Sequence, residues 1–115
     1  MATSDRGDFE NPKKSPYSVE RYDSTWEKSY MELLERNKSV KKWTKNHGIV
    51  IEYITEAGNR RGYIPDFLIE KVDGRIELHE VKGGHLLKNP DTVRKHDRAK
   101  AWCKIRGMNF VIVSK

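Results

Sequence analysis

The sequence predicts a single α/β domain in which helices flank a mixed sheet of about four strands, in the order α-β-β-β-α-β. Helical periodicity is confined to residues 24–36 and 89–106. Strand-like runs joined by turn residues lie between them, and a short apolar run at 109–114 follows the second helix. A hairpin meander followed by a crossover helix and a last strand gives a mixed sheet. A chain of 115 residues is the size of one domain.

The N-terminal segment is polar and has no periodicity. It contains Gly7, Pro12 and Pro16, which disfavour regular structure. We therefore expect a flexible N-terminal arm over residues 1–17 and one folded domain over residues 18–115.

A first helix is expected at residues 24–36, where Ser24 and Glu27 have the spacing of a capping box. Its apolar stripe consists of Trp26, Tyr30, Leu33 and Leu34, with Met31 at the edge. Glu27 lies on the flank of this stripe and should face whatever the helix packs on, whereas Glu35 falls on the solvent side.

Three strands are expected in the middle of the chain, at residues 49–55, 61–72 and 75–82. Residues 40–47 precede them as a basic connection with a helical turn around Trp43. Asp73 and Gly74 are a strong signal for a hairpin between the second and third strands.

The second helix should begin at Pro90, with Asn89 before it, and end at about Arg106, where Gly107 closes it. Lys95 and Arg98 share the helical stripe of Ala99, Trp102 and Ile105. A charge on a core stripe is costly unless it reaches a partner. We expect Lys95 to reach a bound phosphate or the acids described below, with a lysine that snorkels at the core edge as the alternative.

The positive charge is concentrated in the C-terminal third of the chain. The net charge is +6, and residues 82–106 alone hold eight basic and two acidic residues. A localised basic surface is typical of a protein that binds a polyanion such as DNA, and a solvated helix face is the alternative. The candidate nucleic-acid-binding residues are Lys95, Arg98, Arg94, Lys88, Lys42 and Lys45.

Composition also bears on the compartment. Cys103 is the single cysteine, which excludes an internal disulfide and fits a reducing environment. The sequence has no apolar run near the roughly 20 residues of a membrane span and no signal-peptide pattern. We expect a cytoplasmic protein, with no membrane among its partners.

Two acids and a lysine stand out in the expected strands. Glu80 and Lys82 alternate along one strand and therefore point to the same face. With the turn at residues 73–74, Asp66 pairs near residue 81, within cross-strand reach of Glu80 and Lys82.

This combination is typical of phosphodiester hydrolysis. Adjacent carboxylates repel unless a cation neutralises them, and Mg²⁺ binds one or two carboxylates together with water and phosphate oxygens. Such a metal polarises the phosphate and activates a water, while Lys82 can hold that water or offset the developing charge. The alternative is a surface salt bridge between Lys82 and Asp66 or Glu80.

The wider pattern resembles the PD-(D/E)xK nuclease superfamily. The residues that carry the resemblance are Ser24-Thr25-Trp26-Glu27, Leu33-Leu34-Glu35, Val40, Trp43, Ile51-Glu52-Tyr53, Tyr63-Ile64-Pro65-Asp66-Phe67 and Glu80-Val81-Lys82-Gly83. Over about residues 22–84 the chain resembles the TnsA-type endonuclease subunit of cut-and-paste transposases. It also resembles phage head-completion nucleases and the nuclease domains of type III restriction motor subunits.

The resemblance implies a restriction-endonuclease-like core and a Mg²⁺-dependent DNA endonuclease, for which Mn²⁺ can substitute. The catalytic residues that it implies are Glu27, Asp66, Glu80 and Lys82. The metal ligands that it implies are Asp66, Glu80, the Val81 carbonyl and Glu27. Glu20 lies in a stretch, Ser18-Val19-Glu20-Arg21, that resembles the one around Glu27, and it is the alternative candidate for the helix acid. Glu27 is favoured because its distance from Val40 fits the family better and because apolar residues flank it.

Two other functions stay open. One is a non-catalytic nucleic-acid-binding module, and the other is a small basic component of a larger assembly such as a phage particle. The complete set of three acids and a lysine favours the endonuclease, acting in a bacterial or phage-infected cell. The domain has no room for separate recognition elements, so specificity would come from a homodimer or from a partner protein.

Overall fold

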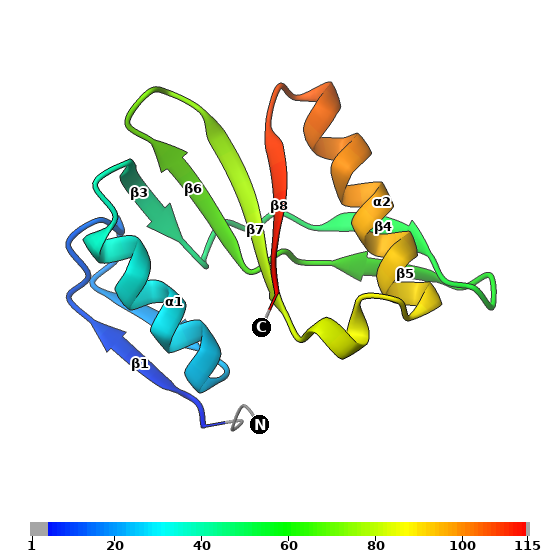
Figure 1. Ribbon diagram of the computed structural model, residues 1–115, viewed down its shortest axis with the longest axis horizontal. Helices are drawn as coiled ribbons and strands as arrows, with labels where there is room; N and C mark the ends of the chain where they lie inside the picture. Colours follow the sequence, from blue (N-terminus) through cyan, green and yellow to red (C-terminus); the bar gives the residue numbers. More distant parts are fainter. Residues whose placement is uncertain (1–4, 115) are drawn as a thin grey trace.

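A four-stranded mixed sheet forms the centre of the computed structural model, which describes residues 5–114 (Figure 1). Its strands are β3 (Val40–Thr44), β6 (Phe67–Lys71), β7 (Ile76–Lys82) and β8 (Asn109–Ser114). They are ordered β3-β6-β7-β8, with antiparallel pairs except for the parallel pair β7–β8. Helix α2 (Pro90–Ile105) makes the crossover between these parallel strands. The predicted fold class is therefore confirmed.

The four-stranded sheet and the two long helices follow the predicted order α-β-β-β-α-β, but the described residues also hold two strands before the first helix and two more between β3 and β6. The strand predicted at residues 49–55 is one of these additional strands and lies outside the central sheet. The order is formed by α1 (Thr25–Arg36), β3, β6, β7, α2 and β8. The connection and helical turn expected over residues 40–47 were wrong, because β3 lies there. A register shift between Val40 and Lys42 lets Val40 and Trp43 both face the core. That spacing of three mimics a helix, which explains the error.

The strand expected at residues 61–72 is in fact two strands. Residues 64–66 separate β5 (Arg60–Tyr63) from β6. β5 pairs with β4 (Ile51–Ile54) in a separate two-stranded sheet beside α2 (Figure 1). A proline inside a strand removes a backbone donor, and Pro65 lies at this break. The break places Asp66 directly before β6.

The N-terminal segment belongs to the fold, so the flexible arm predicted for residues 1–17 was wrong over residues 7–17. β1 (Gly7–Glu10) pairs with β2 (Val19–Tyr22), and residues 1–4 lie outside the described part of the chain. The Glu35 carboxylate accepts hydrogen bonds from the Lys13 and Lys14 amides and from the Trp43 indole, at 2.7, 3.0 and 2.8 Å. Glu35 is thus not a solvent-side acid but ties this segment to α1 and β3.

Helix α1 begins where predicted, with Ser24 as its N-cap. Its buried line runs through Met31 and Leu34, whereas Leu33 is 44 % exposed. The predicted apolar stripe was therefore centred on the wrong side of the helix. The face that is buried runs through Met31 and Leu34 and reaches Glu27 at the edge of the core. This side of the sheet is completed by Val40, Trp43, Phe67 and Ile69.

Helix α2 covers a second core on the other face of the sheet, because β-strand side chains alternate. This core contains Ile51, Tyr63, Leu78, Ala99 and Cys103. Asn89 caps the helix and Gly107 follows it with φ +69°, as predicted. Arg98 and Ile105 are exposed, so their placement on the core stripe was wrong.

Candidate active site

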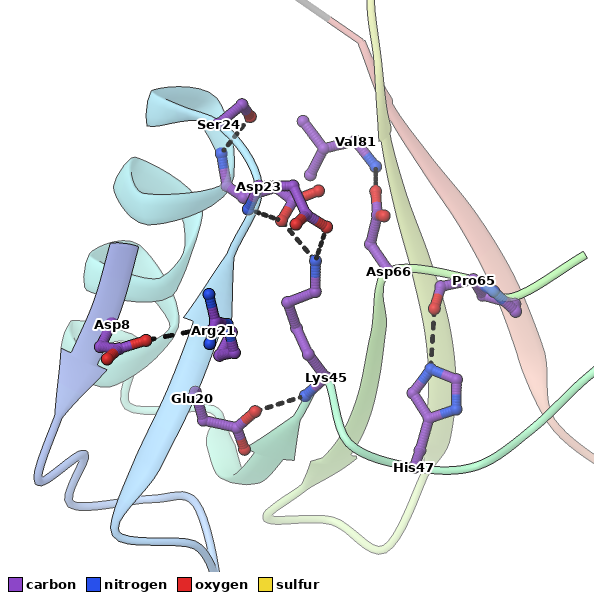
Figure 2. A network of polar contacts seen from close by, with 11 residues as sticks. Asp8, Glu20, Arg21, Asp23, Ser24, Lys45, His47, Pro65, Asp66 and Val81 are labelled. Atoms are coloured by element: carbon purple, nitrogen blue, oxygen red, sulfur yellow. Dashed lines mark hydrogen bonds and ion pairs between the residues drawn. The ribbon is translucent and has the colours of Figure 1, made fainter. Parts of the chain in front are cut away.

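The hairpin between β6 and β7 sets the position of the two candidate acids. Gly74 forms the predicted turn with φ +92°. Phe67 pairs with His79, so Asp66, one residue earlier, lies opposite Glu80 rather than residue 81. The Asp66 carboxylate accepts a hydrogen bond from the Val81 amide at 2.8 Å (Figure 2). The hairpin thus brings Asp66 and Glu80 to one place.

Glu80 is buried, with 5 % of its surface exposed. Its Oε2 lies 3.4 Å from the Lys82 ammonium. Its Oε1 is buried and has no hydrogen-bond partner among the described residues, and the same is true of the Tyr63 hydroxyl. Burial, and next the charge of Glu80, raise the pKa of Tyr63. The Tyr63 hydroxyl also interacts with the Glu80 carboxylate, at a geometry that leaves the Glu80 Oε1 without a full hydrogen bond.

Asp66 holds its proton more tightly than an ordinary aspartate. Burial is the main cause, the charge of Glu80 is the next, and together they raise its pKa to about 7. The hydrogen bond from Val81 opposes this shift, as does the charge of Lys45. The chain leaves this carboxylate pair incompletely neutralised, which fits a hard divalent cation. Among residues 5–114, however, no three His, Cys, Asp or Glu side chains lie close enough to form a metal site by themselves.

Glu27 reaches the same region from α1. Its carboxylate accepts a hydrogen bond from the Asp23 amide at 2.9 Å and contacts the Lys45 ammonium, and its side chain is 13 % exposed. Its charge contributes to the raised pKa of Asp66. Glu27 therefore lies near enough to Asp66 for its charge to act on that carboxyl group.

Glu20, the alternative helix acid, is occupied elsewhere. It lies in β2, 1 % exposed, and accepts hydrogen bonds from the hydroxyls of Ser15 and Thr44. It also accepts one from the Lys45 amide at 3.0 Å (Figure 2). A carboxylate with this many internal donors has little capacity left for a ligand.

His47 supports the segment before Asp66, a role that the sequence reasoning missed. Its Nδ1 accepts a hydrogen bond from the Ile49 amide at 3.0 Å, so its Nε2 donates to the Pro65 carbonyl at 2.7 Å (Figure 2). Burial lowers the pKa of His47 and favours this neutral form. The sequence around His47 does not indicate this role, because the partner of His47 is the backbone oxygen of Pro65, 18 residues away.

Lys95 faces the Glu80 side of the site. It is half-buried, and its ammonium lies 5.1 Å from the centre of the Tyr63 ring. Burial, and next the charge of Lys82, lower the pKa of Lys95, while Glu80 opposes them. The charges of Lys82 and Glu80 therefore both act on Lys95, whereas Arg98, which was predicted on the same helical stripe, is exposed.

The chain also matches a protein family. The model of the TnsA-like endonuclease N-terminal domain matches residues 37–115. The chain belongs to this family. It is a restriction-endonuclease-like, PD-(D/E)xK family, so the predicted resemblance is confirmed. The searches of curated proteins and of solved structures returned no match.

The matched span of the TnsA-like domain contains the strand acids and Lys82 but starts after Glu27. It also contains the other predicted nucleic-acid-binding residues. Arg94 and Arg98 line an open groove between α2 and the β4–β5 hairpin, together with Arg60 and the acids Glu52 and Asp97. Lys42 on β3 and Lys88 before α2 are exposed.

Within the described part of the chain, no helix has the length and apolar character needed to cross a membrane.

Proposed function

We propose that this TnsA-like domain is a Mg²⁺-dependent DNA endonuclease that hydrolyses phosphodiester bonds with a metal-activated water. The observation that carries the proposal is the opposed pair of Asp66 and Glu80, with Lys82 beside them. Asp66 has a raised pKa and Glu80 has a buried oxygen without a full hydrogen bond, so Lys82 and Lys45 leave the pair incompletely neutralised.

Asp66, Glu80 and the Val81 carbonyl would hold the metal. A divalent cation bound there supplies Lewis-acid chemistry and lowers the pKa of water. Mn²⁺ prefers the same oxygen ligands and should substitute for Mg²⁺.

The Lys82 ammonium is 3.4 Å from Glu80, which fixes it at the edge of the carboxylate pair. From there it can orient the attacking water and stabilise the negative charge that develops on the phosphate. Lys95, beside it, can contact a non-bridging phosphate oxygen. His47 and Tyr63 act indirectly, since they contact Pro65 and Glu80 rather than substrate.

The substrate proposal rests on charge. Residues 82–106 carry a net charge of +6, and α2 presents Arg94 and Arg98 on one groove. Phosphate contacts of this kind give affinity without reading sequence. A second copy of the chain or a partner protein would then select the DNA site and provide the second cut.

Plasmid cleavage in Mg²⁺ tests the proposal. Asp66→Ala, Glu80→Ala and Lys82→Ala should each abolish nicking of supercoiled DNA while circular dichroism shows a folded protein. Lys38→Ala is a matched control, because it removes an exposed lysine outside the site and should leave the rate unchanged. Wild-type cleavage by Lys82→Ala would refute the catalytic role. DNA binding without cleavage by the wild type would favour the non-catalytic module instead.

A further inference from the structure

Lys45 lies inside the acid cluster and not on the outer basic surface. Its ammonium contacts the Glu27 carboxylate. It also lies 3.5 Å from the Asp23 carboxylate (Figure 2). Its side chain is only 16 % exposed. The charge of Asp66 also acts on it. A positive charge of the chain itself therefore lies on the α1 side of the candidate active site.

The chain holds this lysine from both ends. Its backbone amide donates to the buried Glu20 carboxylate at 3.0 Å. Its ammonium lies 5.7 Å from the centre of the Phe67 ring, above the core. A lysine that is fixed at the backbone and paired at the tip has lost most of its rotamer freedom. Its position is therefore a property of the fold.

The two sides of the site are neutralised differently. Glu27 has the Lys45 ammonium as its counter-ion. The Asp66 and Glu80 pair has Lys82 near one oxygen of Glu80, and the other oxygen of Glu80 is without a full hydrogen bond. An added cation would therefore bind at Asp66 and Glu80 and not at Glu27. A divalent ion at Glu27 would have to displace Lys45 or lie a few ångströms from it, where like charges repel strongly.

We propose that Lys45 is a positioning residue that fills the place a second divalent cation would need. The site then takes one metal ion, at Asp66 and Glu80, and Glu27 acts by holding Lys45 and not as a metal ligand. This inference rests on the proposed metal-dependent function, and it changes the ligand set that the resemblance implied.

Metal binding to the folded protein gives a test that does not depend on turnover. Calorimetry and Mn²⁺ electron paramagnetic resonance, with DNA absent, should give one ion per chain. Glu27→Gln should change the Mn²⁺ affinity by less than about twofold, whereas Glu80→Gln should weaken it by more than about tenfold. Two ions in the wild type, or an equal loss of affinity in both variants, would overturn the inference.

Lys45→Met tests the same point from the other side, because it keeps the length of the chain but removes the charge. It should bind a second ion that is lost again in Lys45→Met/Glu27→Gln. Lys45→Arg retains the charge and should bind one. A second ion in Lys45→Arg, or none gained in a folded Lys45→Met, would contradict the proposal. If the wild type cleaves DNA but binds two ions, the single-metal inference is refuted and the proposed endonuclease function stands. If the wild type binds one ion but does not cleave DNA, the proposed endonuclease function is refuted and the single-metal inference stands.

Discussion

Replacing Asp66 with asparagine should stabilise the metal-free protein at alkaline pH, although it removes a residue of the candidate active site. The pKa of Asp66 is raised from 3.8 to about 7. Three units correspond to about 4 kcal/mol at most, at roughly 1.4 kcal/mol per unit. The side chain is partly open to water, and an amide oxygen can still accept from Val81. We therefore expect a gain of about 2 kcal/mol in the free energy of unfolding.

The sign of this effect depends on pH. The folded state binds the proton of the Asp66 carboxyl more tightly than the unfolded state does. The stability that this proton provides is therefore fully present below about pH 4. It is lost as the pH rises through about 7. Thermal unfolding in EDTA should therefore show Asp66→Asn melting about 5–10 °C higher than the wild type at pH 8. The difference should shrink as the pH falls and nearly vanish at pH 4.

Asp73→Asn is the matched control. Asp73 is fully exposed and the Arg75 amide lowers its pKa, so its amide variant should gain nothing at pH 8. Added Mn²⁺ should raise the melting temperature of the wild type and not that of Asp66→Asn, which narrows the gap. The reasoning fails if Asp66→Asn is less stable than the wild type at pH 8, or if the gain is the same at both pH values.

Three further predictions concern other parts of the molecule. Glu20→Ala should lower the free energy of unfolding by about 3 kcal/mol or more in urea titrations, because three donors lose a buried acceptor; a loss under 1 kcal/mol would contradict this. Burial, and next Lys82, lower the pKa of His96 to about 4. Stability should therefore fall as the pH drops below 6.5, by up to about 1.4 kcal/mol per unit, and His96→Leu should flatten that fall. The triple variant Arg94→Ala/Lys100→Ala/Lys104→Ala should weaken binding to all DNA sequences alike and lower the salt slope by about one per lost contact; sequence-selective loss would mean that α2 reads bases.

Local signals made the centre of the fold predictable. The turn at Gly74, the cap at Asn89 and the stop at Gly107 each act within a few residues, and all three appear in the structure. Because a hairpin fixes the register of its strands, the turn also brought Asp66 and Glu80 together, with an error of one residue. The sequence therefore predicted the position of the candidate acid pair better than it predicted the elements around that pair.

Elements that depend on distant partners were not predictable. β3 is stabilised by β6 and by Glu35, and its bulge gives a spacing that mimics a helix. The N-terminal hairpin likewise owes its order to contacts with Glu35 and Trp43 that no local pattern shows.

The same limit applies to Lys45. Its charge suggested a DNA contact, but its position follows from Glu20 and Glu27, which lie 25 and 18 residues away in sequence.

The rate of plasmid nicking by metal-stripped protein, with and without added Mg²⁺, tests the central claim most directly. We predict no cleavage in EDTA and full cleavage on addition of Mg²⁺ or Mn²⁺, because the mechanism that we propose activates water through a cation at Asp66 and Glu80. Undiminished cleavage by the purified protein in EDTA would contradict the account.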